Sequence, residues 1–432
     1  MVSARVCVVG LWHLGCVYAS CLAKLGHTVV GTDEDLDVIN SLKAGKAPLF
    51  EPGLDELIAD GIASKRLGFD DIDHAPEMAD YVIIAFDTPV DAHDRVDPAI
   101  IFRVAKRLKL PREATVVVSS QVPVGTCDQL STIFASRGML LDLAYVPENL
   151  RLGQAIERFM KPDMIVIGAT NPSTVSKVRE LFEPIRTKFI EMDTKSAEMT
   201  KHALNAYLAT SISFANEIGN ICDLVGADAL KVADALKSDG RIGERALLRP
   251  GLGFAGGTLA RDLVVLQEAA RKNRYEPVLV NAVLEVNRNQ TTYVVRRVVE
   301  LVGSLKGKTV CILGLTYKPG TDTLRRSAAL EIVGLLQKEG ASVKAFDPKI
   351  ATSSRAPEPM LICDNAYAAC EKAEVVVVLN NSPEFANLDF DRIKKLMKKP
   401  IILDTQNMLD PMQMRSHGFG YAGIGRGTRA TS

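Results

Sequence analysis

The sequence predicts an α/β fold in which two doubly wound sheets are joined by a long central helix in an all-helical middle domain. Short β-branched runs alternate with helix-patterned segments at the start of the chain, and the same alternation returns after residue 305. Between Pro184 and Pro250 a proline-free stretch has apolar residues at four-residue spacing. Uninterrupted apolar strands are typical of parallel sheets covered by helices on both faces. We expect domains at 1–190, 191–300 and 301–432.

The expected strands follow one another along the chain. In the first domain they are R-V-C-V-V-G (5–10), H-T-V-V-G-T-D (27–33), Y-V-I-I-A-F (81–86) and A-T-V-V-V-S-S (114–120), with a helix between the first two. The central helix is expected from about Ser196 onwards, where Leu204, Leu208 and Ile212 repeat at helical spacing. The last domain has strands expected at 308–315, 342–348, 373–379 and 399–405, and a helix at 328–339.

The composition limits the classes of function. The 432 residues are 47% hydrophobic and 24% charged, which indicates a globular protein of several domains. Lys+Arg and Asp+Glu are both 52, so net charge gives no reason to expect nucleic acid or an anionic membrane as a partner. With no run of 18 apolar residues and no charged leader, we expect a cytoplasmic protein.

Eight cysteines form no C-x-x-C pair, and most lie inside apolar runs. They are expected to be buried thiols in a reducing compartment, neither disulfides nor metal ligands. No metal site is predicted.

The turn after the first expected strand has the spacing of a dinucleotide-binding fingerprint. Gly10 and Gly15 flank it, and Asp33 ends the second strand 23 positions after Gly10. In such a turn the helix amino end takes the pyrophosphate and the acid takes the ribose hydroxyls, which favours NAD over NADP. Trp12 occupies the place of the middle glycine, so its side chain must point away. An ordinary strand–turn–helix is the alternative.

Further segments resemble the UDP-glucose/GDP-mannose dehydrogenase family almost from end to end. They occur in the order of the family: P-L-F-E-P-G-L-D-E-L (48–57), D-T-P-V (87–90), V-P-V-G-T (122–126), V-P-E-N-L-R (146–151), A-E-M-T-K-H-A-L-N-A-Y-L-A (197–209), D-G-R-I-G (239–243), G-F-A-G-G-T-L-A-R-D (253–262), G-L-T-Y-K-P-G-T-D-T-L-R (314–325) and G-F-G-Y-A-G-I-G-R (418–426).

The resemblance implies an NAD-binding Rossmann-like domain, a helical dimerisation core and a carboxy-terminal domain for a UDP- or GDP-hexose. The family oxidises the 6-hydroxyl of the sugar twice, through an aldehyde and a cysteine-bound thioester. The implied cofactor-binding residues are Gly10, Trp12, His13, Leu14, Gly15, Asp33, Thr88, Gln121 and Arg325. The implied substrate-binding residues are Glu148, Arg151, Lys201, Asn205, Arg241, Gly253, Phe254, Gly257, Tyr317 and Lys318, with Arg241 reaching the substrate of a neighbouring subunit. The implied catalytic residues are Lys201, Asn205, Asp262 and Glu148, together with Thr258.

Three positions depart from the pattern of the family. Thr258 aligns with its nucleophilic cysteine, Leu152 with its second glutamate, and Gln121 with the threonine before V-P-V-G. A threonine hydroxyl needs an adjacent base before it can attack, so a covalent intermediate on Thr258 is not expected. Its hydroxyl would instead bond the turn or the substrate. Cys127 is expected to be packed in the first turn of a helix.

The remaining candidates have simpler readings as well. Lys201 and Asn205 are four residues apart, so they share a helix face, either as solvated groups or as groups that converge on one ligand. Asp262 is expected to be a helix cap, or a general base that pairs with Lys201 and holds a water, and both roles can hold at once. Glu148 is either a surface carboxylate or an active-site acid. Lys318, Arg241 and Arg325 are either surface charges or phosphate contacts.

The sequence therefore predicts an NAD-dependent oxidation of a nucleotide-activated sugar, with hydride transfer from the 6-carbon and no covalent thiohemiacetal. One alternative is a paralogue that binds NAD and sugar nucleotide without turnover. Another is a dehydrogenase acting at a different sugar carbon in a single two-electron step. A homodimer is expected, because the central helix has a further apolar face to cover.

Overall fold

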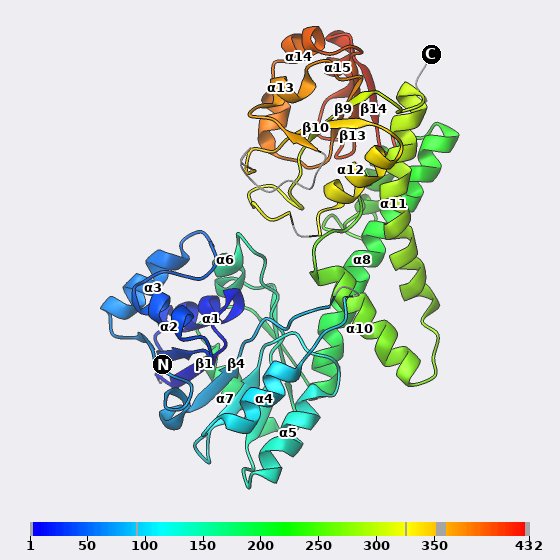
Figure 1. Ribbon diagram of the computed structural model, residues 1–432. Helices are drawn as coiled ribbons and strands as arrows, with labels where there is room; N and C mark the ends of the chain where they lie inside the picture. Colours follow the sequence, from blue (N-terminus) through cyan, green and yellow to red (C-terminus); the bar gives the residue numbers. More distant parts are fainter. Residues whose placement is uncertain (1–2, 92–93, 325, 351–359, 428–432) are drawn as a thin grey trace. The chain divides into compact units, whose positions relative to one another are not determined.

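The computed structural model of the chain describes residues 3–91, 94–324, 326–350 and 360–427. It consists of two compact units, Met1–Leu204 and Asn205–Ser432 (Figure 1). Each unit contains one sheet. Residues 193–308, all of them described, contain no strand. The predicted α/β class, with two sheets and an all-helical middle part, is confirmed.

The sheet of the first unit has the strand order β3-β2-β1-β4-β5-β6-β7-β8. The order reverses between β1 and β4, which makes the carboxyl ends of these two strands the expected ligand-binding position. The strands are β1 (Arg5–Val9), β2 (Thr28–Thr32), β3 (Leu67–Phe69), β4 (Tyr81–Ile84), β5 (Thr115–Val118), β6 (Asp142–Tyr145), β7 (Met164–Ala169) and β8 (Lys188–Met192).

Helices cover both faces of this sheet, because successive strand residues point to opposite sides. Val6 and Val8 of β1 pack with one set of helices and Cys7 and Val9 with the other. The first set is α1 (His13–Lys24), α2 (Leu36–Lys43), α3 (Leu54–Ala63), α6 (Ala155–Met160) and α7 (Pro172–Leu181). The second set is α4 (Ala99–Arg107), α5 (Thr126–Ser136) and the start of α8 (Thr194–Val225).

One feature of the first sheet differs from the expectation of parallel strands. β7 pairs with β6 antiparallel, and β8 follows β7 in parallel, so the last two strands run opposite to the others. A parallel neighbour requires a crossover that returns the chain to the other edge of the sheet. The connection after β6 contains only the short helix α6, and β7 begins at the edge where β6 ended.

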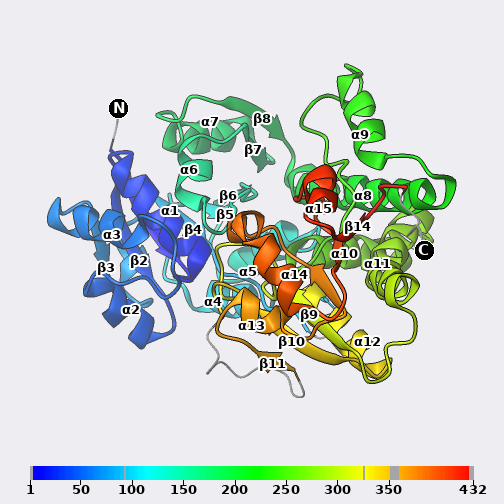
Figure 2. The same ribbon diagram turned by 90° about the horizontal axis from the view of Figure 1, so that it is seen from above.

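The central helix α8 has 32 residues, which corresponds to about 48 Å at 1.5 Å per residue. It begins in the first unit and ends in the second, and it covers the helix predicted from about Ser196. In the second unit it runs beside α11 (Val278–Val302), as Figures 1 and 2 show. Side chains bond the two helices, for example Asn220 to Gln290 at 2.9 Å and Tyr293 to Asp223 at 2.8 Å. Two shorter helices follow α8, namely α9 (Ala229–Ser238) and α10 (Thr258–Lys272).

The second sheet is wholly parallel, with the order β11-β10-β9-β12-β13-β14. α11 and α12 (Ala328–Lys338) cover one face, and α13 (Ala366–Cys370), α14 (Phe390–Leu396) and α15 (Pro411–Ser416) cover the other. The strands are β9 (Thr309–Leu313), β10 (Ser342–Phe346), β11 (Leu361–Ile362), β12 (Val375–Val378), β13 (Ile401–Asp404) and β14 (Gly420–Gly423).

All eight cysteines are free thiols in the protein interior, as predicted. Among the helices of the described residues, none combines the length and apolarity needed to cross a bilayer. The described residues also contain no group of three His, Cys, Asp or Glu side chains arranged to hold a metal ion.

Candidate active site

The turn between β1 and α1 requires both predicted glycines. Gly10 has a φ of 97°, and a Cβ there would meet the ring of Phe86 at 2.8 Å. A Cβ on Gly15 would overlap the carbonyl oxygen of Gly10. The amino end of α1 therefore lies directly on the end of β1, which is the close approach that a dinucleotide turn needs.

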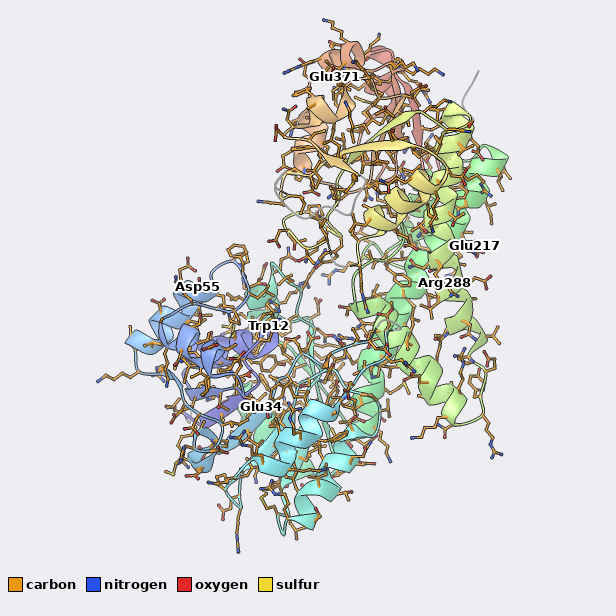
Figure 3. All side chains as sticks on the ribbon, viewed as in Figure 1. Trp12, Glu34, Asp55, Glu217, Arg288 and Glu371 are labelled. Carbon is orange, nitrogen blue, oxygen red and sulfur yellow. The ribbon has the colours of Figure 1, made fainter. Side chains whose placement is uncertain are left out.

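The other residues of this turn would contact a bound cofactor through their backbone N–H groups, not through their side chains. Trp12 is the N-cap residue of α1 and provides no side-chain hydrogen bond to the helix. Its indole is about half exposed and labelled in Figure 3, as expected of a side chain that must leave the phosphate path open. Leu14 is buried in the core. The contact of this turn with a diphosphate would come from N–H groups at the helix amino end.

Asp33 lies one residue beyond β2 and is held beside the turn. Its Oδ2 accepts the N–H of Leu11 at 2.5 Å, and its Oδ1 accepts the N–H of Asp35 at 3.0 Å. A carboxylate at this place can accept ribose hydroxyls and repels a 2′-phosphate. Together with the glycine turn, it fits an NAD-binding site.

Two further predicted cofactor residues bond each other. The hydroxyl of Thr88 donates to the carbonyl oxygen of Gln121 at 2.7 Å, and both residues are buried. They follow β4 and β5, at the same sheet edge as the glycine turn. Arg325, the last cofactor residue implied by the sequence, lies outside the described residues.

Lys201, which is buried, and Glu148, which is partly buried, form an ion pair in the first unit. The Nζ of Lys201 donates to the carbonyl oxygen of Glu148 at 2.5 Å and lies 3.2 Å from its Oε1. The side chains are 5% and 16% exposed, so Glu148 is not a surface carboxylate. α8 thereby places a cation against the loop that follows β6.

Asn205 and Asp262 form a second pair, in the second unit. The side-chain amide of Asn205 donates to the Oδ2 of Asp262, and Asp262 is fully buried. The helix-cap alternative for Asp262 is wrong, because α10 already begins at Thr258 and Gly257 is its N-cap residue. Lys201 and Asn205 are one turn apart on α8, so this helix carries one member of each pair.

Thr258 is exposed at the first position of α10. The thiols offer no replacement for a nucleophilic cysteine, because all eight are buried. Cys127 lies in the first turn of α5, as predicted, where burial and then the nearby Glu198 carboxylate raise its pKa well above the usual value. A thiol with a raised pKa is a poor source of thiolate.

Glu198 and His202, which the sequence analysis did not single out, lie one turn apart on α8 and are fully buried. Glu198 accepts the N–H groups of Gly125 at 2.5 Å and Cys127 at 2.8 Å. The Nε2 of His202 donates to the carbonyl oxygen of Val122 at 2.8 Å. Both side chains therefore anchor the V-P-V-G-T-C segment to α8. Only the fold brings these groups together.

The second unit has a cavity of about 370 Å³ at the carboxyl ends of β9 and β12. This is where the strand order of the second sheet reverses, the usual ligand position of such sheets. Tyr317 and Lys318 line it after β9, and the ammonium of Lys318 lies 5.5 Å from the ring centre of Tyr317. Gly253, at a φ of 87°, lines the opposite wall.

Asp347 repeats in the second unit what Asp33 does in the first. It follows β10 and accepts the N–H of Leu315 at 2.8 Å, beside Gly314, whose φ of 98° matches that of Gly10. Asn380 donates to Asp347 at 3.1 Å and lines the cavity. The acid at the end of the second strand of this unit, in F-D-P, is the sequence signal by which this residue can be recognised.

Other predicted substrate residues are more scattered. The side chain of Arg241 is 89% exposed and pairs with Asp239 at 2.6 Å. Arg151 is exposed, whereas Phe254 is buried in an apolar cluster between α8, α10 and α11. Gly257 adjoins Arg326, whose guanidinium nitrogen would lie 3.3 Å from a Cβ there.

Comparisons with known proteins agree with this geometry. Three models of the UDP-glucose/GDP-mannose dehydrogenase family match the chain: the NAD binding domain at 4–186, the central domain at 195–289 and the UDP binding domain at 311–411. The sequence is 37% identical to UDP-glucose 6-dehydrogenase TuaD of Bacillus subtilis, over 98% of this chain and 93% of that protein. It is 36% identical to UDP-glucose 6-dehydrogenase of Rhizobium meliloti, over 98% and 99%.

Solved structures agree as well. A UDP-glucose dehydrogenase from Pyrobaculum islandicum matches with a TM-score of 0.88 and 31% identity, over 98% of both chains. The UDP-N-acetyl-mannosamine dehydrogenase Cap5O of Staphylococcus aureus matches with a TM-score of 0.80 and 26% identity, over 98% and 99%. The resemblance predicted from the sequence motifs is thus confirmed, and with it the NAD cofactor. The chain is an NAD-dependent oxidoreductase that belongs to the UDP-glucose/GDP-mannose dehydrogenase family.

Proposed function

We propose that this chain oxidises the 6-hydroxyl of a UDP-hexose, with UDP-glucose as the first candidate. The observation that carries the proposal is the position of Lys201 and Asn205 on one turn of α8, each bonded to a carboxylate-bearing residue. The cavity lined by Tyr317 and Lys318 supports binding of the nucleotide by the second unit. The curated relatives named UDP-glucose 6-dehydrogenase support the sugar and the carbon.

The proposed chemistry uses the two pairs in different ways. NAD, when bound, supplies the hydride acceptor. Asp262 serves as the general base through a water, which takes the proton from the hydroxyl oxygen as hydride leaves the carbon that bears this hydroxyl. The ammonium of Lys201 stabilises the negative charge that develops on the sugar oxygen. Asn205 holds Asp262 by its side-chain hydrogen bond and offers a further polar contact to the sugar.

We infer that the reaction stops after one hydride transfer. Thr258 has no thiolate to capture an aldehyde, and Leu152 supplies no second carboxylate beside Glu148. The product would then be an aldehyde. The purified chain, given NAD and UDP-glucose, UDP-N-acetyl-mannosamine or GDP-mannose in turn, should form NADH fastest with UDP-glucose. Binding of both ligands without NADH would favour the alternative of a non-catalytic paralogue.

A homodimer is proposed from the surface of α8. Tyr207, Phe214 and Ile221 recur every seven residues and are 68%, 46% and 47% exposed, and Leu224 and Val225 extend the stripe. A stripe with this period is typical of helices that pair with another helix. The natural occupant is the same stripe of a second copy across a two-fold axis. The exposed Arg241 would then reach the substrate of the partner.

The oligomeric state tests this pairing. Ile221→Glu together with Leu224→Glu should convert a dimer to a monomer in analytical ultracentrifugation, because charges replace the apolar stripe. Met412→Glu, at an even more exposed apolar residue on α15, is the control and should leave the dimer intact. A monomeric unmodified protein with full activity would contradict the shared site.

We also propose three functional domains, at 1–190, 191–300 and 301–432. The two sheets with strand-free residues between them support this division. A cytoplasmic location is proposed from the eight free, buried thiols, which suit a reducing compartment.

A further inference from the structure

Glu51 is a buried carboxylate that joins three segments of the first unit. It lies in the connection between α2 and α3, and only 1% of its side chain is exposed. Its Oε2 lies 2.8 Å from the Nε2 of His13 and 2.7 Å from the backbone nitrogen of Gly153. Its Oε1 accepts the N–H of Ala155 at 2.9 Å. Burying a carboxylate is costly unless it is hydrogen-bonded in this way.

One arm of Glu51 holds the cofactor turn. His13 is the first residue of α1 and lies between Gly10 and Gly15, the two glycines that shape this turn. Because Glu51 already accepts two backbone N–H groups, the Nε2 of His13 is the donor of their shared hydrogen bond. This bond fixes the orientation of the imidazole at the amino end of α1.

The other arm holds the loop that carries Glu148. Gly153, with a φ of 85°, and Ala155, the first residue of α6, donate their N–H groups to Glu51. The near end of the same loop is closed by Glu148 itself, whose Oε2 accepts the N–H of Leu150 at 2.7 Å. The loop is therefore held at both ends, by Glu148 at its start and by Glu51 at residues 153–155.

We propose that Glu51 is a positioning residue that couples the NAD-binding turn to the Glu148 loop. A displacement of the turn when NAD binds is transmitted through His13 and Glu51 to residues 153–155, and so to the backbone that receives Lys201. The sequence distances are large, 38 residues to His13 and 102 to Gly153, so no local element imposes this link. The part that concerns Glu148 rests on the function proposed above.

The test compares Glu51→Gln with Asp55→Asn. Glutamine keeps the size of the side chain but replaces one of the two acceptor oxygens by an NH₂ group. It therefore cannot accept all three hydrogen bonds that Glu51 accepts. Asp55, labelled in Figure 3, lies in the first turn of α3 and accepts the N–H of Ala47 at 2.9 Å, so it is a neighbouring, exposed carboxylate outside the network. Trp12 is the sole tryptophan and adjoins His13, so its fluorescence reports NAD binding without turnover.

We expect NAD to slow hydrogen exchange in the peptide covering residues 148–155 of the unmodified protein, and Glu51→Gln to abolish that effect. The Kd for NAD should rise about tenfold, and kcat should fall roughly 10- to 100-fold because the reacting groups are misplaced. Asp55→Asn should change none of these. His13→Gln should weaken NAD binding as Glu51→Gln does, and the double variant should bind no more weakly than either single variant.

Two results would overturn the proposal. One is that Glu51→Gln only lowers the melting temperature, while NAD-dependent exchange protection and kcat remain as in the unmodified protein. The other is that the effects of Glu51→Gln and His13→Gln on NAD binding add independently. If the unmodified protein binds NAD but turns over no sugar nucleotide, the proposed function fails. The exchange and fluorescence measurements would still decide the role of Glu51.

Discussion

Lys201 contacts Glu148 twice, through the backbone carbonyl oxygen at 2.5 Å and the carboxylate at 3.2 Å. The ammonium group is thus held by the loop after β6 before any substrate binds. A cation fixed in a buried site stabilises developing negative charge without having to reorganise during the reaction.

Lys201→Met should therefore lower kcat by about 10²- to 10⁴-fold, because the methionine fills the space but carries no charge. Glu148→Gln should have a smaller effect, since the carbonyl contact remains. The measurement is NADH formation at saturating UDP-glucose and NAD. Lys195→Met, at an exposed position near the start of the same helix, is the control. An unchanged kcat in Lys201→Met would remove this lysine from the mechanism.

The product stoichiometry tests the reading of Thr258. Without a covalent tether an aldehyde can diffuse away, so we expect about one NADH per sugar consumed and an aldehyde trappable by hydroxylamine. Thr258→Cys alone should not restore efficient uronate formation, because Leu152 and Gln121 still lack the polar groups of the family pattern. Two NADH per sugar, with a uronate as sole product, would show that the missing cysteine is dispensable.

Cofactor preference depends on Asp33, whose carboxylate is held beside the cofactor turn by the N–H of Leu11. Asp33→Ser should reduce the preference for NAD over NADP by at least about tenfold, or 1.4 kcal/mol, because the repulsion of a 2′-phosphate is removed. Asp37→Ser, an exposed acid on α2, serves as control. The measurement is the ratio of the two dissociation constants. Equal or tighter NADP binding by the unmodified protein would contradict the assignment.

Acid stability should depend on His27, which is 4% exposed. Its Nδ1 accepts the N–H of Ala4 at 3.3 Å, and its Nε2 donates to the carbonyl oxygen of Leu181 at 3.0 Å. The bond from Ala4 requires a neutral ring, because a protonated Nδ1 cannot accept, and burial lowers the pKa of His27. The unfolded chain, with an ordinary pKa of about 6.5, binds the proton first. The contribution of the neutral His27 to the free energy of unfolding is therefore complete above about pH 6.5. It is lost as the pH falls towards the lower pKa that His27 has in the folded protein.

Unfolding by urea between pH 7.5 and pH 5 should show this loss. As the pH falls, the free energy of unfolding of the unmodified protein should decrease by up to about 1.4 kcal/mol per pH unit more than that of His27→Gln, whose side chain cannot be protonated. His74 is the control, because it is exposed and its side-chain hydrogen bond to the Asp71 carboxylate raises its pKa, the opposite direction. His74→Gln should change the pH dependence little. Parallel curves for the unmodified protein and His27→Gln would contradict the prediction.

The sequence by itself determined the fold class, the positions of most strands and the family. Buried parallel strands consist of short runs rich in β-branched residues. Such runs occur at β1, β4, β5, β9 and β12, and they can be recognised without knowing which strands lie beside them. Gly10, Gly15 and Asp33 were likewise recognisable, because a dinucleotide turn fixes their spacing locally. The long helix α8 followed from its period and the absence of proline.

Only the tertiary structure decided which of these residues meet. The antiparallel direction of β7 depends on where the chain re-enters the sheet, which no local pattern records. Asp262 resembled a helix cap because the sequence pattern placed the N-cap of α10 at Asp262, five residues after its true position at Gly257. Glu51, Glu198 and Asp347 each accept hydrogen bonds from backbone N–H groups. Almost every residue type has such a group, so the sequence does not show which residue is the donor. Such contacts form between segments distant in sequence, so they exist only once the sheets and helices have packed.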